Sequence, residues 1–141
     1  MKRNLAVLLS VAAALLFSTV TYADHHAVKV TKSEKLGSFL TDTKGMTLYW
    51  FKSDSPGKSA CTGGCVEKWP LYYRKEVKPP EEVKAADFST ITREDGKPQT
   101  TFRGYPLYYF AGDKAAGDAN GQGLKDVWFV IDPAKFPPAA K

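Results

Sequence analysis

The chain has only two histidines, the adjacent pair His25 and His26. Because no histidine follows them, the rest of the chain lacks the usual general base of Ser-His-Asp and Cys-His mechanisms. The same absence removes the imidazole partner of copper–thiolate sites and the Cys-x-x-Cys-His sequence that attaches haem. We therefore expect that the protein is not an enzyme. The acid–base alternative that survives is a carboxylate pair formed by Asp54 and Asp113.

Long apolar runs are also scarce, since only one occurs, from Leu5 to Phe17. It follows the basic start of the chain and precedes small residues that end at Ala23, which predicts a secretory signal peptide over residues 1–23. The run is short for a membrane span, and no cysteine stands at the expected cleavage site. We therefore expect no transmembrane anchor and no lipid attachment, and a location in the periplasm or outside the cell.

The chain lacks a long block of one charge. Its formal net charge is +5 over 141 residues, and removal of residues 1–23, with two basic residues and no acidic one, leaves +3. A spread charge of this size does not indicate a nucleic-acid partner. The 118 residues that remain suffice for one domain. We expect the partner to be an unknown small molecule or a periplasmic protein.

What the chain does contain is a duplication with an offset of 59 residues. The segment from Gly45 to Asp54 returns as Gly104 to Asp113, and the register continues without a gap as far as Tyr73. Eight of the 29 positions compared are identical, where chance gives about two. Neither copy could bury both faces of so short a sheet, so we expect the copies to pack about a pseudo-twofold axis.

Short aromatic and β-branched runs, separated by Gly, Asp, Asn and Pro, predict antiparallel strands joined by tight turns. We expect an all-β fold, a small antiparallel sandwich or barrel, with one short helix at 80–87. The predicted domain spans 37–132, with repeats at about 37–73 and 89–132 and a join at 74–88. Residues 24–36 are expected to be a flexible N-terminal segment and 133–141 a C-terminal tail. The predicted strands are 37–41, 46–52, 69–73, 89–93, 99–102, 106–110 and 127–131.

Each copy carries the motif Tyr-x-Phe-x-x-Asp. Within a strand, the tyrosine and phenylalanine point to one face, whereas Leu48 and Trp50 of the first copy point to the other. Each aspartate falls where its strand should end, so we expect its carboxylate to accept hydrogen bonds from backbone N–H groups of the following turn. The motif residues are Tyr49, Phe51 and Asp54 in the first copy and Tyr108, Phe110 and Asp113 in the second.

The two motifs resemble the paired Tyr-x-aromatic-x-x-Asp signature of a bacterial family of secreted repeats, often labelled predicted lipoproteins. The resemblance covers about Gly37 to Ile131. It includes Cys61-Thr62-Gly63-Gly64-Cys65 before Trp69-Pro70, and the glycine-rich loop 112–123 before Trp128. It implies an exported module whose biochemical role is not settled. The chain departs from the lipoprotein label because it lacks the lipidation cysteine.

The chain's two cysteines, Cys61 and Cys65, predict a disulfide in an exported protein. A metal or redox site is the rival interpretation, because two thiolates at this spacing can bind copper or zinc. The duplication argues against the rival. The aligned residues of the second copy are Asn120 and Leu124, so the equivalent loop is built there without sulfur.

The favoured hypothesis is an exported, non-catalytic module that binds a ligand through aromatic side chains. The candidates for this surface are Trp50, Trp69, Tyr105, Tyr109 and Trp128, although each of them could instead belong to the core. The alternative hypothesis is a periplasmic metal-handling or electron-transfer accessory protein. After cleavage at Ala23 the chain begins Asp24-His25-His26, a sequence that can hold Cu(II) or Ni(II) through its amine, backbone amides and imidazole. No other cofactor is predicted.

Overall fold

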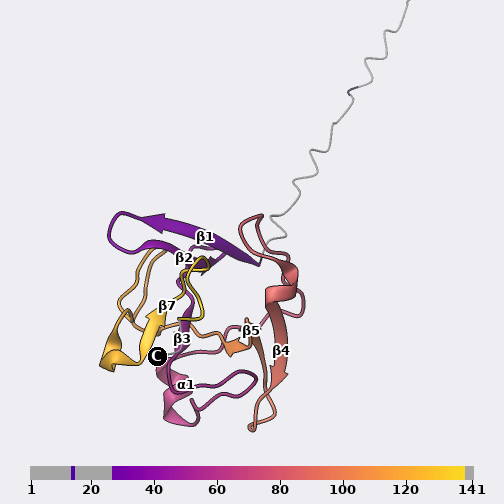
Figure 1. Ribbon diagram of the computed structural model, residues 1–141, viewed down its shortest axis with the longest axis vertical. Helices are drawn as coiled ribbons and strands as arrows, with labels where there is room; N and C mark the ends of the chain where they lie inside the picture. The colour runs from indigo at the N-terminus through magenta and orange to yellow at the C-terminus, as the bar shows by residue number, and fades with distance from the viewer. Residues whose placement is uncertain (1–13, 15–26, 139–141) are drawn as a thin grey trace, which may run out of the picture.

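Strands dominate the regular structure of the chain in a computed structural model that describes Ala14 and residues 27–138 (Figure 1). They are accompanied by one five-residue α-helix and two 3₁₀ turns within the described residues. The expected all-β class is confirmed. The strands are β1 (Val28–Ser33), β2 (Gly37–Asp42), β3 (Tyr49–Phe51), β4 (Phe88–Thr92), β5 (Pro98–Phe102), β6 (Tyr105–Pro106) and β7 (Trp128–Val130). The other elements are α1 (Gly64–Lys68), η1 (Ala85–Asp87) and η2 (Leu124–Asp126).

Within the described residues the strands form three small antiparallel sheets, β1–β2, β3–β7 and β4–β5–β6. The β1–β2 hairpin pairs Val28 with Asp42, and the β4–β5 hairpin pairs Phe88 with Phe102. The two hairpins are equivalent parts of the two copies, because they lie about 60 positions apart in the sequence. Figure 1 shows β1 and β2 across the top of the molecule and β4 and β5 at its right, with β3 and β7 below the first hairpin. The duplicated unit therefore includes β1.

Three boundaries predicted from the sequence need correction. Residues 28–33, expected to be flexible, form β1 and pair along their whole length with β2. Of the helix expected at 80–87, only the 3₁₀ turn at 85–87 forms, and the α-helix lies instead in the loop that contains Cys65. Within the expected tail, Pro133 and Phe136 are buried and Arg103 donates hydrogen bonds to both of their carbonyl oxygens.

The last strand of each copy pairs with the other copy. Strand β3 of the first copy pairs with β7 of the second, with Tyr49 opposite Val130. The bridge between Tyr108 and Leu71 is the equivalent pair, since each residue is related to its counterpart by the offset of 59. Two backbone hydrogen bonds also join one copy to the other. They run from the Leu40 N–H to the Ile131 carbonyl at 2.9 Å and from the Thr100 N–H to the Tyr72 carbonyl at 3.0 Å. The copies are interlocked about a pseudo-twofold axis.

Strand β3 lies between two hydrophobic clusters. Tyr49 belongs to one cluster and Trp50 to the other, as the alternation of side chains along a strand requires. The smaller cluster consists of Tyr49, Cys61, Trp69, Tyr108 and Trp128. The larger one consists of Val28, Leu40, Leu48, Trp50, Tyr72, Val83, Phe102, Leu107, Ile131 and Phe136. We call these the motif core and the outer core.

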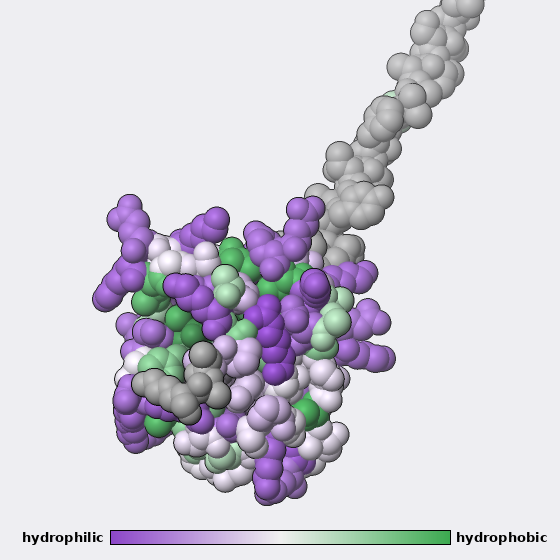
Figure 2. Space-filling model, viewed as in Figure 1, coloured by the Kyte–Doolittle hydropathy of each residue, from purple (hydrophilic) through white to green (hydrophobic). Residues whose placement is uncertain are grey.

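Hydrophilic side chains surround the face of the molecule shown in Figure 2, with smaller hydrophobic areas between them. In the part of the chain that the structure describes, no helix has the length and apolar character needed to cross a membrane. Apart from Ala14, the predicted signal peptide lies outside the described residues.

Candidate functional site

The tyrosine of each motif donates a hydrogen bond to the aspartate of the other motif, across the pseudo-twofold axis. The Tyr49 hydroxyl donates to Asp113 Oδ2 at 2.6 Å, and the Tyr108 hydroxyl donates to Asp54 Oδ2 at 2.7 Å. The backbones of the two tyrosines are also joined by reciprocal N–H to O hydrogen bonds of 2.8 and 3.0 Å. Each motif therefore completes its hydrogen bonding only with the other copy.

The second oxygen of each aspartate accepts a backbone hydrogen bond, as the sequence predicts. Asp54 Oδ1 accepts from the Ala60 N–H at 2.6 Å, and Asp113 Oδ1 accepts from the Asn120 N–H at 2.9 Å. Both carboxylates are buried, with exposed fractions of 7% each. With a tyrosine and a backbone amide bound to each carboxylate, this arrangement anchors the loop that follows each motif.

Four aromatic rings form a stack through the motif core. Trp69 and Trp128 lie face to face at the centre, with ring centroids 3.7 Å apart and planes 5° from parallel. Phe51 covers the outer face of Trp128 at 4.2 Å, and Phe110 covers Trp69 at 4.5 Å. Because both pairs are related by the offset of 59, the stack repeats the symmetry of the hydrogen bonds. The duplicated residues therefore build the interface between the copies.

Burial sets the protonation of these groups. It raises the pKa of the Tyr49 and Tyr108 hydroxyls far above their usual range, and the hydrogen-bonded aspartates add to the shift. Burial also raises the pKa of Asp54. Hydrogen bonds from Ala60 and Tyr108 and the charge of Arg93 offset part of that effect. Arg93 is itself buried and donates to Ser59 Oγ at 2.7 Å and to the Cys61 carbonyl at 2.6 Å.

The predicted disulfide between Cys61 and Cys65 is confirmed, with Cα atoms 5.4 Å apart. Cys61 is fully buried in the motif core, so the bridge fixes the loop that follows Asp54. In the second copy Gly121 occupies the corresponding loop, where a Cβ atom would come within 2.8 Å of the Trp69 ring and 2.9 Å of the Tyr49 ring. The first loop is held by sulfur and the second by close packing of a glycine.

Replacement of both cysteines by alanine is expected to lower the free energy of unfolding by about 2 kcal/mol, because a five-residue loop loses its covalent closure. We expect the fold to persist, since the second copy forms its loop without a disulfide. Urea unfolding followed by circular dichroism measures the change. Loss of the folded spectrum in the absence of urea would contradict the expectation.

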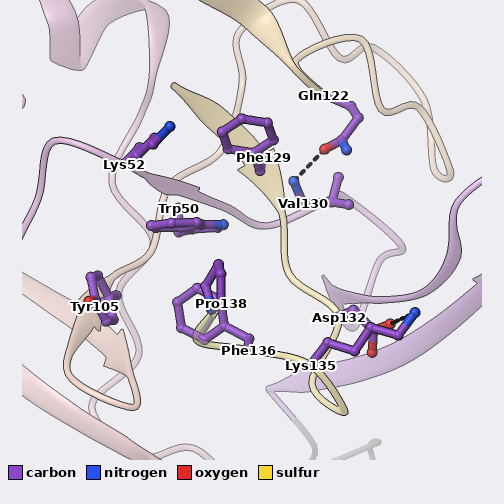
Figure 3. A pocket seen from close by; sticks show the side chains of 10 residues that line it. All are labelled: Trp50, Lys52, Tyr105, Gln122, Phe129, Val130, Asp132, Lys135, Phe136 and Pro138. Carbon is purple, nitrogen blue, oxygen red and sulfur yellow. Dashed lines mark hydrogen bonds and ion pairs between the residues drawn. The ribbon is translucent and has the colours of Figure 1, made fainter. Parts of the chain in front are cut away.

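An aromatic groove lies on the other face of β3, against the outer core (Figure 3). Its volume is about 630 Å³, and it is open to solvent. Trp50 forms the centre of its wall, packed edge-on against Tyr105 at 5.5 Å and Phe136 at 5.0 Å. Phe129 stands beside it at 6.1 Å, because the two residues are opposite each other in the β3–β7 register. The full lining is Trp50, Lys52, Tyr105, Gln122, Phe129, Val130, Asp132, Lys135, Phe136 and Pro138.

The pseudo-symmetric position is occupied by different side chains. Tyr109 replaces Trp50 there, its hydroxyl donates to Asp42 Oδ2 at 2.8 Å, and its ring packs edge-on against Tyr72 at 5.7 Å. The offset of 59 also places Ala111 at the position of Lys52 and Pro70 at that of Phe129. The groove therefore lies where the two copies differ, whereas the motif core lies where they agree.

Of the five aromatic residues predicted to form a ligand surface, the structure places two in the groove and three elsewhere. Trp50 and Tyr105 line the groove. For Trp69 and Trp128 the prediction is wrong, because they are only 5% and 4% exposed and form the central pair of the ring stack. Tyr109 is half-buried and bound to Asp42, so it does not line the groove.

Sequence reasoning missed the other groove residues, above all Lys52, Phe129 and Phe136. Two of these stand where the copies diverge, with Lys52 against Ala111 and Phe129 against Pro70. Such divergence within an otherwise matching repeat is the signal that could have found them. Phe136 lies in the C-terminal segment beyond the repeat, where the sequence offers no comparable signal.

The predicted metal site falls on His25 and His26, which lie outside the described residues. Within residues 27–138, no three His, Cys, Asp or Glu side chains come together in a way that could hold a metal ion. The predicted copper site therefore stays a prediction from the sequence.

Fold and site together define a class of protein, a small all-β domain of two interlocked repeats whose tyrosines and aspartates pair across a pseudo-twofold axis. A family model described as a secreted repeat of unknown function matches residues 30–72 and 89–132. The chain belongs to this family, as its paired motifs predict. The matched segments agree with the structural copies, since the first includes most of β1. The family description also supports the predicted export.

The chain matches no curated protein and no solved structure.

Proposed function

We propose that this protein is an exported, non-catalytic binding module that holds a small molecule with a flat apolar part in the groove beside Trp50. It acts in the periplasm or outside the cell. The observation that carries the proposal is the asymmetry of the duplicated fold. A groove lies beside Trp50, while at the equivalent position Tyr109 donates a hydrogen bond to Asp42.

The size and walls of the groove support a small-molecule ligand. Its volume of about 630 Å³ falls within the range of roughly 300–1,000 Å³ that is usual for such sites. Aromatic rings favour flat apolar ligands, because stacked and edge-on contacts add to the free energy of burying apolar area. Trp50, Phe129 and Tyr105 present such rings from three different strands, so the site is built on rigid elements.

The side chains that line the groove support binding and not catalysis. The lining contains no histidine, cysteine or serine, and its carboxylate, Asp132, accepts a hydrogen bond from the Ala134 N–H at 2.9 Å. The buried aspartates of the motif core are bound to tyrosines on the opposite face of β3. Binding and release is the activity that these side chains support best.

A direct test uses N-phenyl-1-naphthylamine, a neutral, flat probe whose fluorescence rises in apolar surroundings. We expect saturable binding by the mature protein, and at least about a tenfold loss of affinity in Trp50→Ala, since the main stacking surface is removed. Because Trp50 also packs in the outer core, Phe129→Ala is a second variant, expected to weaken binding in the same direction. Circular dichroism establishes that each variant is folded.

Tyr73→Ala is the matched control, because Tyr73 is an exposed aromatic residue outside the groove lining, with an exposed fraction of 37%. It should bind the probe as the unmodified protein does. Saturable binding that is unchanged in folded Trp50→Ala and Phe129→Ala, or no binding at all, would remove the groove as the binding site.

A further inference from the structure

The side-chain acceptors around the groove are bound to donors of the protein itself, whereas several side-chain donors are not bound to any acceptor that the structure describes. Asp132 Oδ1 accepts from the Ala134 N–H, and Asp132 Oδ2 lies 3.9 Å from the Lys135 ammonium group. Gln122 Oε1 accepts from the Val130 N–H at 2.7 Å (Figure 3). The carboxylate and amide oxygens of the groove are therefore already occupied by the protein's own donors.

Three side-chain donors of the groove have no such partner among the residues that the structure describes. The Lys52 ammonium group makes no hydrogen bond or ion pair with any residue that the structure describes. The Gln122 amide nitrogen and the Trp50 indole N–H are likewise without a partner among residues 27–138. Since no buried side-chain nitrogen of this part lacks a hydrogen bond, the indole N–H is open to solvent, and Figure 3 shows it at the end of the ring nearest Val130.

Lys135 adds a second ammonium group that its partner holds only loosely. Its side chain is 84% exposed and lies 3.9 Å from Asp132, a geometry in which an ion pair contributes little. The charged side chains of the lining are Lys52, Lys135 and Asp132, so the groove carries a net positive charge. A negative group beside the aromatic wall would be attracted by both ammonium groups, by the modest amount usual for exposed charges.

Lys52 is placed beside the groove by the turn that follows β3. It comes directly after Phe51, the last residue of the strand, and its side chain lines the groove together with Trp50. The Lys52 N–H donates to the Val127 carbonyl at 2.8 Å, and the Asp54 N–H closes the turn by donating to the Phe51 carbonyl at 3.0 Å. The second copy has Ala111 at the equivalent position, so the charge is present at the groove and absent from the position related to it by the offset of 59.

We infer that the ligand of this groove is a flat apolar anion, an aromatic or polycyclic ring system that carries a carboxylate, sulfonate or similar acidic group. The ring lies against Trp50 and Phe129, and the acidic group accepts from Lys52, with Lys135 as the second cation. This inference rests on the proposed function, since it names the chemistry of the ligand that the groove holds.

The test compares two probes that differ by one acidic group, neutral N-phenyl-1-naphthylamine and 8-anilino-1-naphthalenesulfonate. The measured quantity is the ratio of their affinities for each variant of the full mature chain. Lys52→Gln should lower the preference for the sulfonate by up to about fivefold, because one exposed charge contact is lost. Raising the salt concentration should reduce the preference of the unmodified protein and have less effect on the variant.

Lys97→Gln is the matched control, because it removes the same charge from the exposed turn between β4 and β5, outside the groove lining. Its affinity ratio should equal that of the unmodified protein. If the neutral probe binds at Trp50 but Lys52→Gln leaves the ratio unchanged, the anionic ligand is excluded and the proposed function stands. If neither probe depends on Trp50 or Phe129, the proposed function itself fails. An equal fall of the ratio in both lysine variants would mean general attraction to a basic protein and would also overturn the inference.

Discussion

Replacement of either Trp69 or Trp128 by alanine is expected to lower the free energy of unfolding by about 3–5 kcal/mol, the usual effect of removing a buried aromatic ring. Domains of this size have a total stability of about 5–15 kcal/mol, so each variant should be close to unfolding. The two losses should be similar, because the residues are related by the pseudo-twofold axis. Each stacks on the other at 3.7 Å and on one phenylalanine. Urea unfolding of both variants measures the two values.

Tyr73→Ala is again the control, expected to change the free energy of unfolding by no more than about 0.5 kcal/mol, because Tyr73 is exposed. A loss below 1 kcal/mol for either tryptophan, or a large loss for only one of them, would contradict the symmetric ring stack.

Alkaline pH is expected to unfold the protein steeply above about pH 10. Burial raises the pKa of Tyr49, Tyr72 and Tyr108 far above the value of about 10 for an unfolded chain. The hydroxyls therefore stay protonated in the folded state, whereas they ionise in the unfolded state. Stability is fully present below pH 10 and is lost above it, by about 4 kcal/mol per pH unit for these three fully buried side chains.

The measurement follows phenolate absorbance and circular dichroism as the pH rises, and the two transitions should coincide for the buried tyrosines. Tyr108→Phe should make the loss of stability with pH less steep by about 1.4 kcal/mol per pH unit, since one ionising group is removed. Tyr73→Phe, at an exposed site, should leave the steepness unchanged. Ionisation of all tyrosines at their ordinary pKa without unfolding would show that the motif core is open to water.

The sequence predicts much of the fold, because its duplication and its period-two patterns reflect local physical requirements. Alternation along β3 places Tyr49 and Trp50 in different clusters, and the structure confirms it. The spacing of Cys61 and Cys65 predicts their disulfide. The role of Asp54 as an acceptor for the following turn is confirmed by its bond to the Ala60 N–H.

The hydrogen bonds and strand pairs that join the two copies could not be predicted in this way, because they connect residues far apart in the sequence. Tyr49 and Asp113 are separated by 64 positions, and no local pattern indicates that they meet. The aromatic residues of the ring stack and of the groove also have similar sequence surroundings. Trp50 and Trp128 both lie in short strands and are both largely buried, and only the packing of the two copies decides which of them lines the groove.

The duplicated motif forms the core, and we propose that the function belongs to the groove, where the copies differ. The most direct test is a titration of the ¹⁵N-labelled mature protein with N-phenyl-1-naphthylamine, followed through the indole N–H resonances of its three tryptophans. We predict a saturable shift of the Trp50 resonance, with those of Trp69 and Trp128 nearly unmoved. A larger shift of Trp69 or Trp128, or no shift of Trp50 at saturation, would contradict this division between core and groove.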